Sequence, residues 1–362
     1  EAEEALKLSE RIFYRKGKGH SLLLVGKVYD ENEDFEKGQS FLLQAANTLR
    51  STDALLLEET YTRLGNSYLR KQTYKKATEY FEKALPLSRA LRQQEGLFNT
   101  LLRLGICYLE TAQYPKAIEV YEEALQMHPQ ANAPTTRRTL LAQQAHAYYL
   151  KGDYMQALKN HKELLAIDES TDDKAAQANT LNNIGFFYYQ RGEEALAFQN
   201  FQKAYNLSED LKQLGATTLT NLATLSAKQG NYQTSRKYFT EVLELQGQTP
   251  VAQATTKNHL AANYLYFKEY NNARKFALEA LEEGQSLDAP EVRRDSYRIL
   301  SEIYERTNNY KESQQYYQRY LAVRDSLEQQ KRKQEQRLLQ QDLEDEKKEK
   351  DFQLLLAEKE NQ

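Results

Sequence analysis

Small, aromatic and aliphatic residues recur along this chain in a fixed helical pattern, and the clearest copy covers residues 61–87. In its second half, Ala77, Phe81 and Ala84 are four and three residues apart, so they share one face of a helix. Gly65 belongs to an equally amphipathic helix just before it. A single helical hairpin cannot bury such a face, whereas a stack of hairpins can. The pattern therefore predicts an array of paired helices.

The same register returns about every 40 residues. A small residue marks the first helix of each copy, at Gly26, Gly65, Gly105, Ala145, Gly185, Ala223, Ala261 and Ser301. In seven of these eight copies a tyrosine follows three residues later, and in all of them a second small residue follows twelve residues later. Small side chains at both positions let the two helices of a pair approach closely, and a bulky replacement should cost about 1–3 kcal/mol. The sequence thus predicts eight helix–turn–helix repeats.

This register resembles that of the tetratricopeptide repeat (TPR) family. The residues that carry the resemblance are, in the copy quoted above, Tyr61, Leu64, Gly65, Tyr68, Ala77, Phe81 and Ala84. The resemblance extends over residues 19–321 and implies an all-α fold, a right-handed superhelical solenoid of about eight repeats. A period near 40 residues, against the 34 typical of the family, implies longer helices.

Both ends of the chain differ from the repeats. Residues 1–16 predict one amphipathic helix ended by Gly17 and Gly19, which would be part of a further repeat. The expected organisation is an N-terminal helix in residues 1–18, the array in 19–321, and a charged helical connector in 322–362.

The connector is predicted to continue the second helix of the last repeat. From Tyr310 onward the sequence contains neither glycine nor proline, which predicts a helix of about 50 residues. Its apolar residues between 328 and 351 are Leu338, Leu339 and Leu343, too few for a regular coiled-coil seam. A solvated charged helix and a dimerising connector therefore both remain open.

The block YYQRYLAVRDSL, followed by charged residues, resembles the end of the repeat region in Bacteroidetes-type signalling proteins. The resemblance implies a sensing region on the periplasmic side of a membrane anchor. A histidine kinase or a DNA-binding output domain would then lie outside this sequence.

Composition excludes several other classes of function. The net charge of −3 and a pI near 6.1 argue against nucleic-acid binding as the main function. A lone cysteine, Cys107, excludes an internal disulfide or a thiolate metal site and is expected to be an inert core thiol. No apolar run is long enough to span a membrane. Metal-ligand, nucleotide-binding and nucleophile motifs are missing, so we expect no catalytic residue, no metal and no cofactor, and not an enzyme.

Family resemblance also indicates where a ligand would bind. In TPR proteins the first helices line a concave groove, at positions six and three before the small residue and one, four and five after it. Asparagines and arginines at or beside such positions are the candidate ligand-binding residues: Arg63, Asn66, Arg103, Asn179, Asn182, Asn183, Asn221, Asn258 and Arg298.

An amide can donate to and accept from a peptide backbone, and an arginine can bind a ligand carboxylate. Asn182, Asn183 and Asn221 match the asparagine ladder of kinesin light chains. The alternative is that the asparagines bond only to one another between neighbouring helices, and that the arginines pair with nearby glutamates.

The resulting hypothesis is a non-catalytic protein- or peptide-binding TPR module, the sensing region of a bacterial signal-transduction protein that could dimerise through residues 322–362. Two alternatives remain, a soluble intracellular scaffold or adaptor and a receptor for a short signalling peptide.

Overall fold

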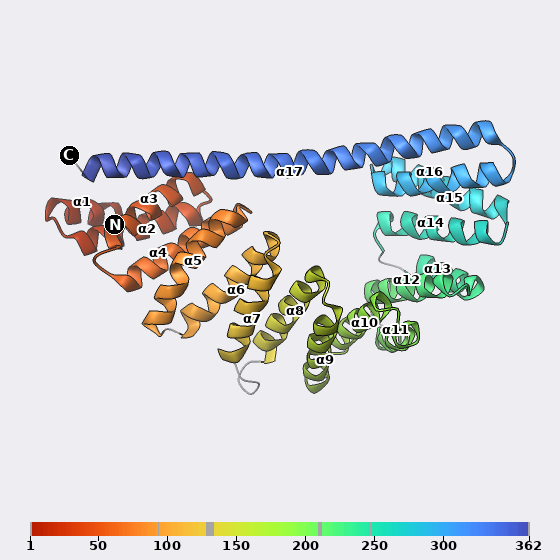
Figure 1. Cartoon of the computed structure of the whole chain (residues 1–362), viewed down its shortest axis with the longest axis horizontal. Coiled ribbons are helices and arrows are strands. Elements are labelled where there is room, and N and C mark those ends of the chain that lie inside the picture. Colours follow the sequence, from red (N-terminus) through yellow and green to blue (C-terminus); the bar gives the residue numbers. More distant parts are fainter. Residues whose placement is uncertain (1, 93, 128–133, 209–211, 246–247, 361–362) are drawn as a thin grey trace. The chain divides into compact units, whose positions relative to one another are not determined.

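The computed structural model of the chain describes residues 2–92, 94–127, 134–208, 212–245 and 248–360. These residues form helices joined by short turns, with no strand among them (Figure 1). The helices are α1 (Ala2–Arg11), α2 (Arg15–Glu31), α3 (Phe35–Leu49), α4 (Ala54–Arg70), α5 (Tyr74–Leu91), α6 (Gln94–Glu110), α7 (Tyr114–Met127), α8 (Pro134–Lys151), α9 (Tyr154–Ser170), α10 (Lys174–Gln190), α11 (Glu194–Leu207), α12 (Lys212–Lys228), α13 (Tyr232–Glu244), α14 (Pro250–Tyr266), α15 (Tyr270–Ser286), α16 (Pro290–Arg306) and α17 (Tyr310–Glu360).

Eight helix pairs, from α2–α3 to α16–α17, match the eight predicted repeats. Each predicted small residue lies in the first helix of its pair, and the second small residue lies in the partner helix. The all-α fold and the repeat register predicted from the sequence are confirmed.

Close helix packing explains the glycines of this register. A Cβ atom added to Gly65 would lie 2.7 Å from the ring of Phe81, and one added to Gly105 would lie 2.5 Å from the ring of Tyr121. Real Cβ contacts essentially never fall below 3.0 Å. The aromatic ring of the second helix therefore occupies space that only a glycine leaves open.

All eight pairs turn through one motif. Seven residues after the small residue the backbone has a positive φ, at Glu33, Gln72, Ala112, Gly152, Gly192, Gly230, Lys268 and Asn308. In the fourth pair the Asp153 amide donates to the Tyr148 carbonyl at 2.8 Å, and the Gly152 amide donates to the Tyr149 carbonyl at 2.9 Å. These two bonds define a Schellman motif. The backbone carbonyl of the recurring tyrosine thus accepts one of the hydrogen bonds that close the turn, while its ring packs against the hydrophobic core.

The N-terminal helix differs from the prediction. One helix ended by Gly17 and Gly19 was expected, but α1 ends at Arg11 and α2 begins at Arg15 and contains both glycines. The break is another positive-φ turn, at Phe13, closed by the Tyr14 amide on the Ser9 carbonyl at 2.9 Å. Gly19 has a packing role, because a Cβ there would lie 2.6 Å from the Leu49 side chain.

The chain divides into two compact units, Glu1–Asn160 with Leu338–Gln362, and His161–Arg337. In the first unit, one hydrophobic cluster contains Leu42, Phe81 and Tyr121 among its fully buried side chains. In the second unit, Ala223, Phe239 and Leu260 form one cluster, and residues of α14, α15 and α16 form another.

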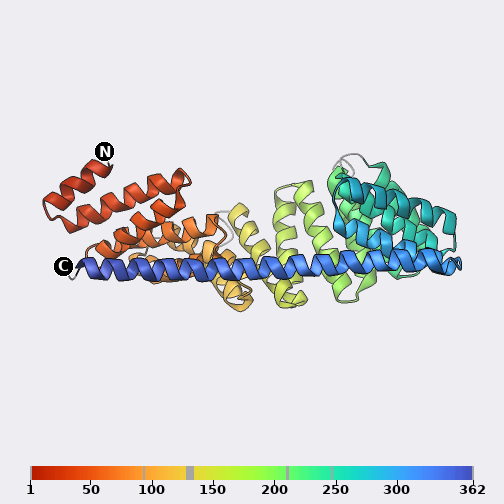
Figure 2. The same ribbon diagram turned by 90° about the horizontal axis from the view of Figure 1, so that it is seen from above.

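The last helix confirms the prediction of about 50 uninterrupted helical residues. α17 has 51 residues and is a single helix (Figure 2). At its start, the ring of Tyr316 stacks on Tyr304 of α16 at 5.4 Å between centroids. Leu343 is 56% exposed, and the side chains of Leu338 and Leu339 lie outside the described part of the chain. Within the described residues, none of the helices has the length and apolar character that a membrane crossing requires.

Candidate functional site

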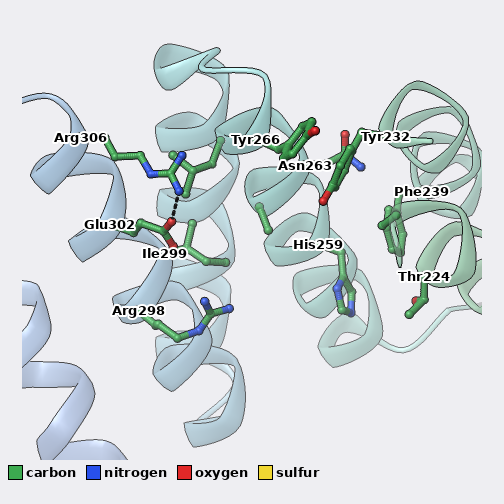
Figure 3. Close-up of a pocket in the computed structure, with 13 residues that line it drawn as sticks. Thr224, Tyr232, Phe239, His259, Asn263, Tyr266, Arg298, Ile299, Glu302 and Arg306 are labelled. Carbon is green, nitrogen blue, oxygen red and sulfur yellow. Dashed lines mark hydrogen bonds and ion pairs between the residues drawn. The ribbon is translucent and has the colours of Figure 1, made fainter. Parts of the chain in front are cut away.

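A cavity of about 310 Å³ opens in the second unit among the first helices of the last three repeats (Figure 3). α12, α14 and α16 supply most of its wall, and α13 supplies two aromatic side chains. The lining residues are Thr224, Ala227, Tyr232, Phe239, His259, Ala262, Asn263, Leu265, Tyr266, Arg298, Ile299, Glu302 and Arg306.

Two stacked aromatic pairs form the wall between α13 and α14. Tyr232, the first residue of α13, stacks on Tyr266, the last residue of α14, with centroids 3.5 Å apart. Deeper along the same helices, Phe239 stacks on His259 at 5.0 Å with the planes 4° apart. Flat stacked rings give this wall a rigid apolar surface.

The position of Phe239 follows from the repeat register. In the repeats of Gly65, Gly105 and Gly185, the aromatic ring at this register position lies where a Cβ of the glycine would be. The sixth repeat has Ala223 instead, and its Cβ prevents so close an approach. Phe239 still packs on Ala223 and Leu260, and it also lines the cavity.

Charged residues lie on the opposite wall, along α16. Arg306 donates to Glu302 at 2.6 Å, so this pair is internally neutralised. Arg298 is exposed, extends from α16 toward His259, and has no ion-pair partner among the described residues (Figure 3). Arg298 therefore supplies a cation in this cavity that no carboxylate neutralises.

His259 adds no positive charge at neutral pH. Its ring is accessible from the cavity, yet the surrounding protein lowers the pKa of the imidazole, chiefly by desolvation and further by Arg298. Asp295 acts in the opposite direction, with an effect on the pKa that is smaller than that of desolvation but larger than that of Arg298. A lowered pKa keeps the ring neutral at pH 7, when an ordinary histidine is already mostly deprotonated.

Asn263 is a buried polar group in the wall. The residue is 3% exposed, and its Nδ2 donates to Ser235 Oγ at 3.0 Å. Its Oδ1 is buried without a hydrogen-bond partner. Leaving such an acceptor unsatisfied costs about 1–3 kcal/mol of stability.

Of the nine predicted site residues, Arg298 is the one that lines this cavity. Asn182 and Asn221 lie on α10 and α12, and the Asn221 Nδ2 donates to Asn182 Oδ1 at 2.8 Å. This is the bond between neighbouring first helices that the alternative interpretation of the asparagines expects. Asn179 and Asn183 are exposed on α10, and whether they bind a ligand stays a prediction.

Asn258 is oriented toward α16. It is 5% exposed, donates to the Val292 carbonyl at 3.0 Å and accepts from Ser296 Oγ at 2.9 Å. These bonds join α14 to α16 and leave little of the amide accessible to a ligand.

The other three candidates belong to the first unit. Arg63 donates to Glu59 at 3.0 Å on the same helix, as the alternative interpretation of the arginines expects. Asn66 is half-buried with an unpartnered Oδ1, and Arg103 is half-buried on α6. Their binding role stays a prediction.

The choice of asparagines and arginines as candidate residues left out most of the cavity wall, although the repeat register predicts many of the lining positions. Eight of the thirteen lining residues occupy the expected groove positions, three before or one, four or five after the small residue: Thr224, Ala227, Ala262, Leu265, Tyr266, Arg298, Glu302 and Arg306. The aromatic residues Tyr232 and Phe239 come from the second helix, which that rule does not cover.

Cys107 is the buried core thiol that the sequence predicted. It is fully buried, and desolvation raises its pKa to about 12, so it stays protonated and unreactive. Among the described residues, no cluster of His, Cys, Asp and Glu has the arrangement of a metal site.

Comparison with known proteins places these observations in a family. Models described as tetratricopeptide repeat match residues 56–130, 136–210, 215–282 and 296–333, more than half of the chain. No curated protein sequence matches significantly.

Solved structures with the same fold include BtubC (BKLC) from P. vanneervenii, with 17% identity and a TM-score of 0.51 over 60% of this chain and 92% of that one. The apo quorum sensor NprR from B. thuringiensis has 17% identity and a TM-score of 0.55, over 88% of this chain and 91% of that one.

A STAND protein with a tetratricopeptide repeat sensor, PH0952 from Pyrococcus horikoshii, has 13% identity and a TM-score of 0.60 over 86% of this chain. The match covers 49% of that protein, so this chain corresponds to about half of it. At these identities the likenesses establish the fold alone. The family models and the eight paired helices together establish that this chain is a member of the tetratricopeptide repeat family, a family of protein-interaction modules.

Proposed function

We propose that this chain is a non-catalytic module that binds a peptide or an extended protein segment across α12, α14 and α16. The supporting observation is the cavity at the groove positions of three successive first helices. Its volume of about 310 Å³ is at the lower end of the range of ligand pockets. Such a cavity holds one or two side chains of a longer segment.

A sensing role in signal transduction is the more specific form of this proposal. It is supported by the fold shared with a TPR sensor region and with a quorum sensor. A binding event would have to favour one arrangement of the repeats over another to be transmitted. The connector in residues 322–362 would carry that change to an output domain. Sequence downstream of the same gene, with a kinase or a DNA-binding domain, would support the sensor, whereas a scaffold requires neither.

The likeness to NprR, which extends over 88% of this chain and 91% of that one, favours a receptor for a short signalling peptide as the second candidate. Both candidates require a peptide in the groove, and they differ in the source of that peptide. A secreted peptide encoded beside the gene would favour the receptor.

Filling the cavity tests the proposal directly. Ala262 is an exposed residue of α14 in the cavity wall, so Ala262→Phe should occupy the space. Ala195 is also exposed, on α11, and does not line the cavity, so Ala195→Phe adds the same bulk elsewhere. Peptides selected from a random library on the wild-type chain would be measured on both variants by fluorescence anisotropy.

We expect Ala262→Phe to weaken binding at least about tenfold, equivalent to about 1.4 kcal/mol, and Ala195→Phe to leave it unchanged. Failure to select any peptide, or equal binding by both variants, would contradict the proposal.

A further inference from the structure

We propose that the cavity selects a peptide segment in which a carboxylate lies next to a large apolar side chain. This inference rests on the proposed function and specifies the ligand chemistry of the same site.

Arg298 determines the charge of the ligand. The other arginine of the wall, Arg306, is held by Glu302, and the neighbouring Asp295 is paired with Arg294 at 2.8 Å. The nearby carboxylates of Glu302 and Asp295 are thus each held by another arginine, and no ion pair to Arg298 is formed among the described residues. A carboxylate with its planar geometry is the natural partner of a guanidinium.

The adjacent surface determines the apolar part. Phe239, Leu265 and Ile299 are buried side chains that line the cavity, and the stacked ring of His259 continues their surface. Phe239 lies on the wall facing Arg298 (Figure 3). One ligand residue can thus place an aromatic or long aliphatic side chain on this surface while the carboxylate beside it reaches Arg298.

The cavity therefore combines one cation with one apolar surface, which correspond to a carboxylate and an apolar side chain of the ligand.

The test uses the full chain and four fluorescein-labelled octapeptide pools with fixed central residues Phe-Glu, Phe-Gln, Ala-Glu and Ala-Gln. The other positions carry uncharged residues, and every peptide has an amidated C-terminus. A fifth pool has Phe-Gln at the centre and a free C-terminal Phe. It separates a terminal carboxylate from a side-chain carboxylate. Binding is measured by anisotropy for the wild type, Arg298→Gln and Arg274→Gln.

Arg274 is the matched control, since it is exposed on α15, donates to the uncharged Asn271 and does not line the cavity. We expect the Phe-Glu or the free-acid pool to bind the wild type about tenfold to a hundredfold more tightly than Phe-Gln, the range for a charge-assisted bond. Arg298→Gln should remove this preference, and Arg274→Gln should keep it. Both variants should keep the wild-type helical circular dichroism.

The outcomes separate the two proposals. If no pool binds the wild type and random-library selection also fails, the proposed function fails and this inference fails with it. If peptides bind but Phe-Glu and free-acid pools show no advantage over Phe-Gln, the inference alone is overturned. Persistence of the preference in Arg298→Gln, or equal binding of Ala-Glu and Phe-Glu, overturns it as well.

Discussion

At the scale of single residues, the ring of Tyr121 packs closely against Gly105, but its buried hydroxyl is unfavourable for the stability of the fold. Phe81 and Phe201 occupy the same register position in two other glycine repeats, and each fits its ring against a glycine as Tyr121 does against Gly105. The hydroxyl of Tyr121 is buried without a hydrogen-bond partner. A buried hydroxyl without a partner is destabilising, because water has been removed and nothing replaces it.

We therefore expect Tyr121→Phe to stabilise the first unit by about 1 kcal/mol, measured as a higher midpoint of urea unfolding. Tyr108→Phe is the matched control, because the Tyr108 hydroxyl donates to Glu82 at 2.7 Å. Removing a bond to a carboxylate should lower stability by a similar amount. Destabilisation by Tyr121→Phe would indicate that its hydroxyl has a partner.

At the scale of elements, the eight turns use one backbone motif with different residues at the positive-φ position. Gly192 has φ of +78° and no atom within 4 Å of an added Cβ, so Gly192→Ala tests backbone strain alone. Ala112 occupies the same position with φ of +56°. A residue with a Cβ loses about 1–2 kcal/mol of stability when it adopts the left-handed conformation. A glycine avoids this strain, but it loses more conformational freedom on folding, which lowers stability by roughly 0.5–1 kcal/mol relative to alanine.

The first effect is larger, so Gly192→Ala should lower the free energy of unfolding by about 0.5–1 kcal/mol and Ala112→Gly should raise it by a similar amount. Chemical denaturation of both variants beside the wild type checks the signs. Two changes of the same sign would mean that side-chain contacts at these turns outweigh the backbone.

The sequence predicted the helices and their contacts well where the repeat register and the local residue preference indicate the same structure. Gly65 and Gly105 could be assigned to close helix contacts because a repeated register supported them. Gly19 could not, since its neighbour Leu49 is 30 residues away and a glycine beside Gly17 equally indicates a helix end. The positive-φ turn at Phe13 was equally hidden, because phenylalanine is an uncommon residue in that conformation.

At the scale of the molecule, the candidate site could be predicted in part. The groove positions of the first helices follow from the register, and Arg298 was among the residues selected from them. The aromatic wall depends on how far α13 and α14 lie from one another. That separation is determined by tertiary packing, and a single sequence does not report it. Asn258 illustrates the converse, because its register position is near the groove while its side chain bonds to α16.

A homodimer formed through the connector is a prediction at the scale of the molecule, and α17 makes it testable. The helix has 51 residues and would extend about 75 Å. Residues 328–351 offer three leucines for a partner, and a denser apolar group follows at Phe352 and Leu354–Leu356 in the sequence. Two copies that pair their connectors would bury these apolar side chains away from water, which favours association.

We therefore expect the full chain to have twice the monomer mass by multi-angle light scattering, and a chain that ends at residue 327 to be a monomer. The truncated chain retains Tyr316 and its stack on Tyr304, so it should keep the helical circular dichroism of the repeats and serve as its own folding control. A monomer mass for both chains would exclude the dimer and leave the solvated charged helix. A dimer mass for both would place the association in the repeats, because the connector would then be dispensable.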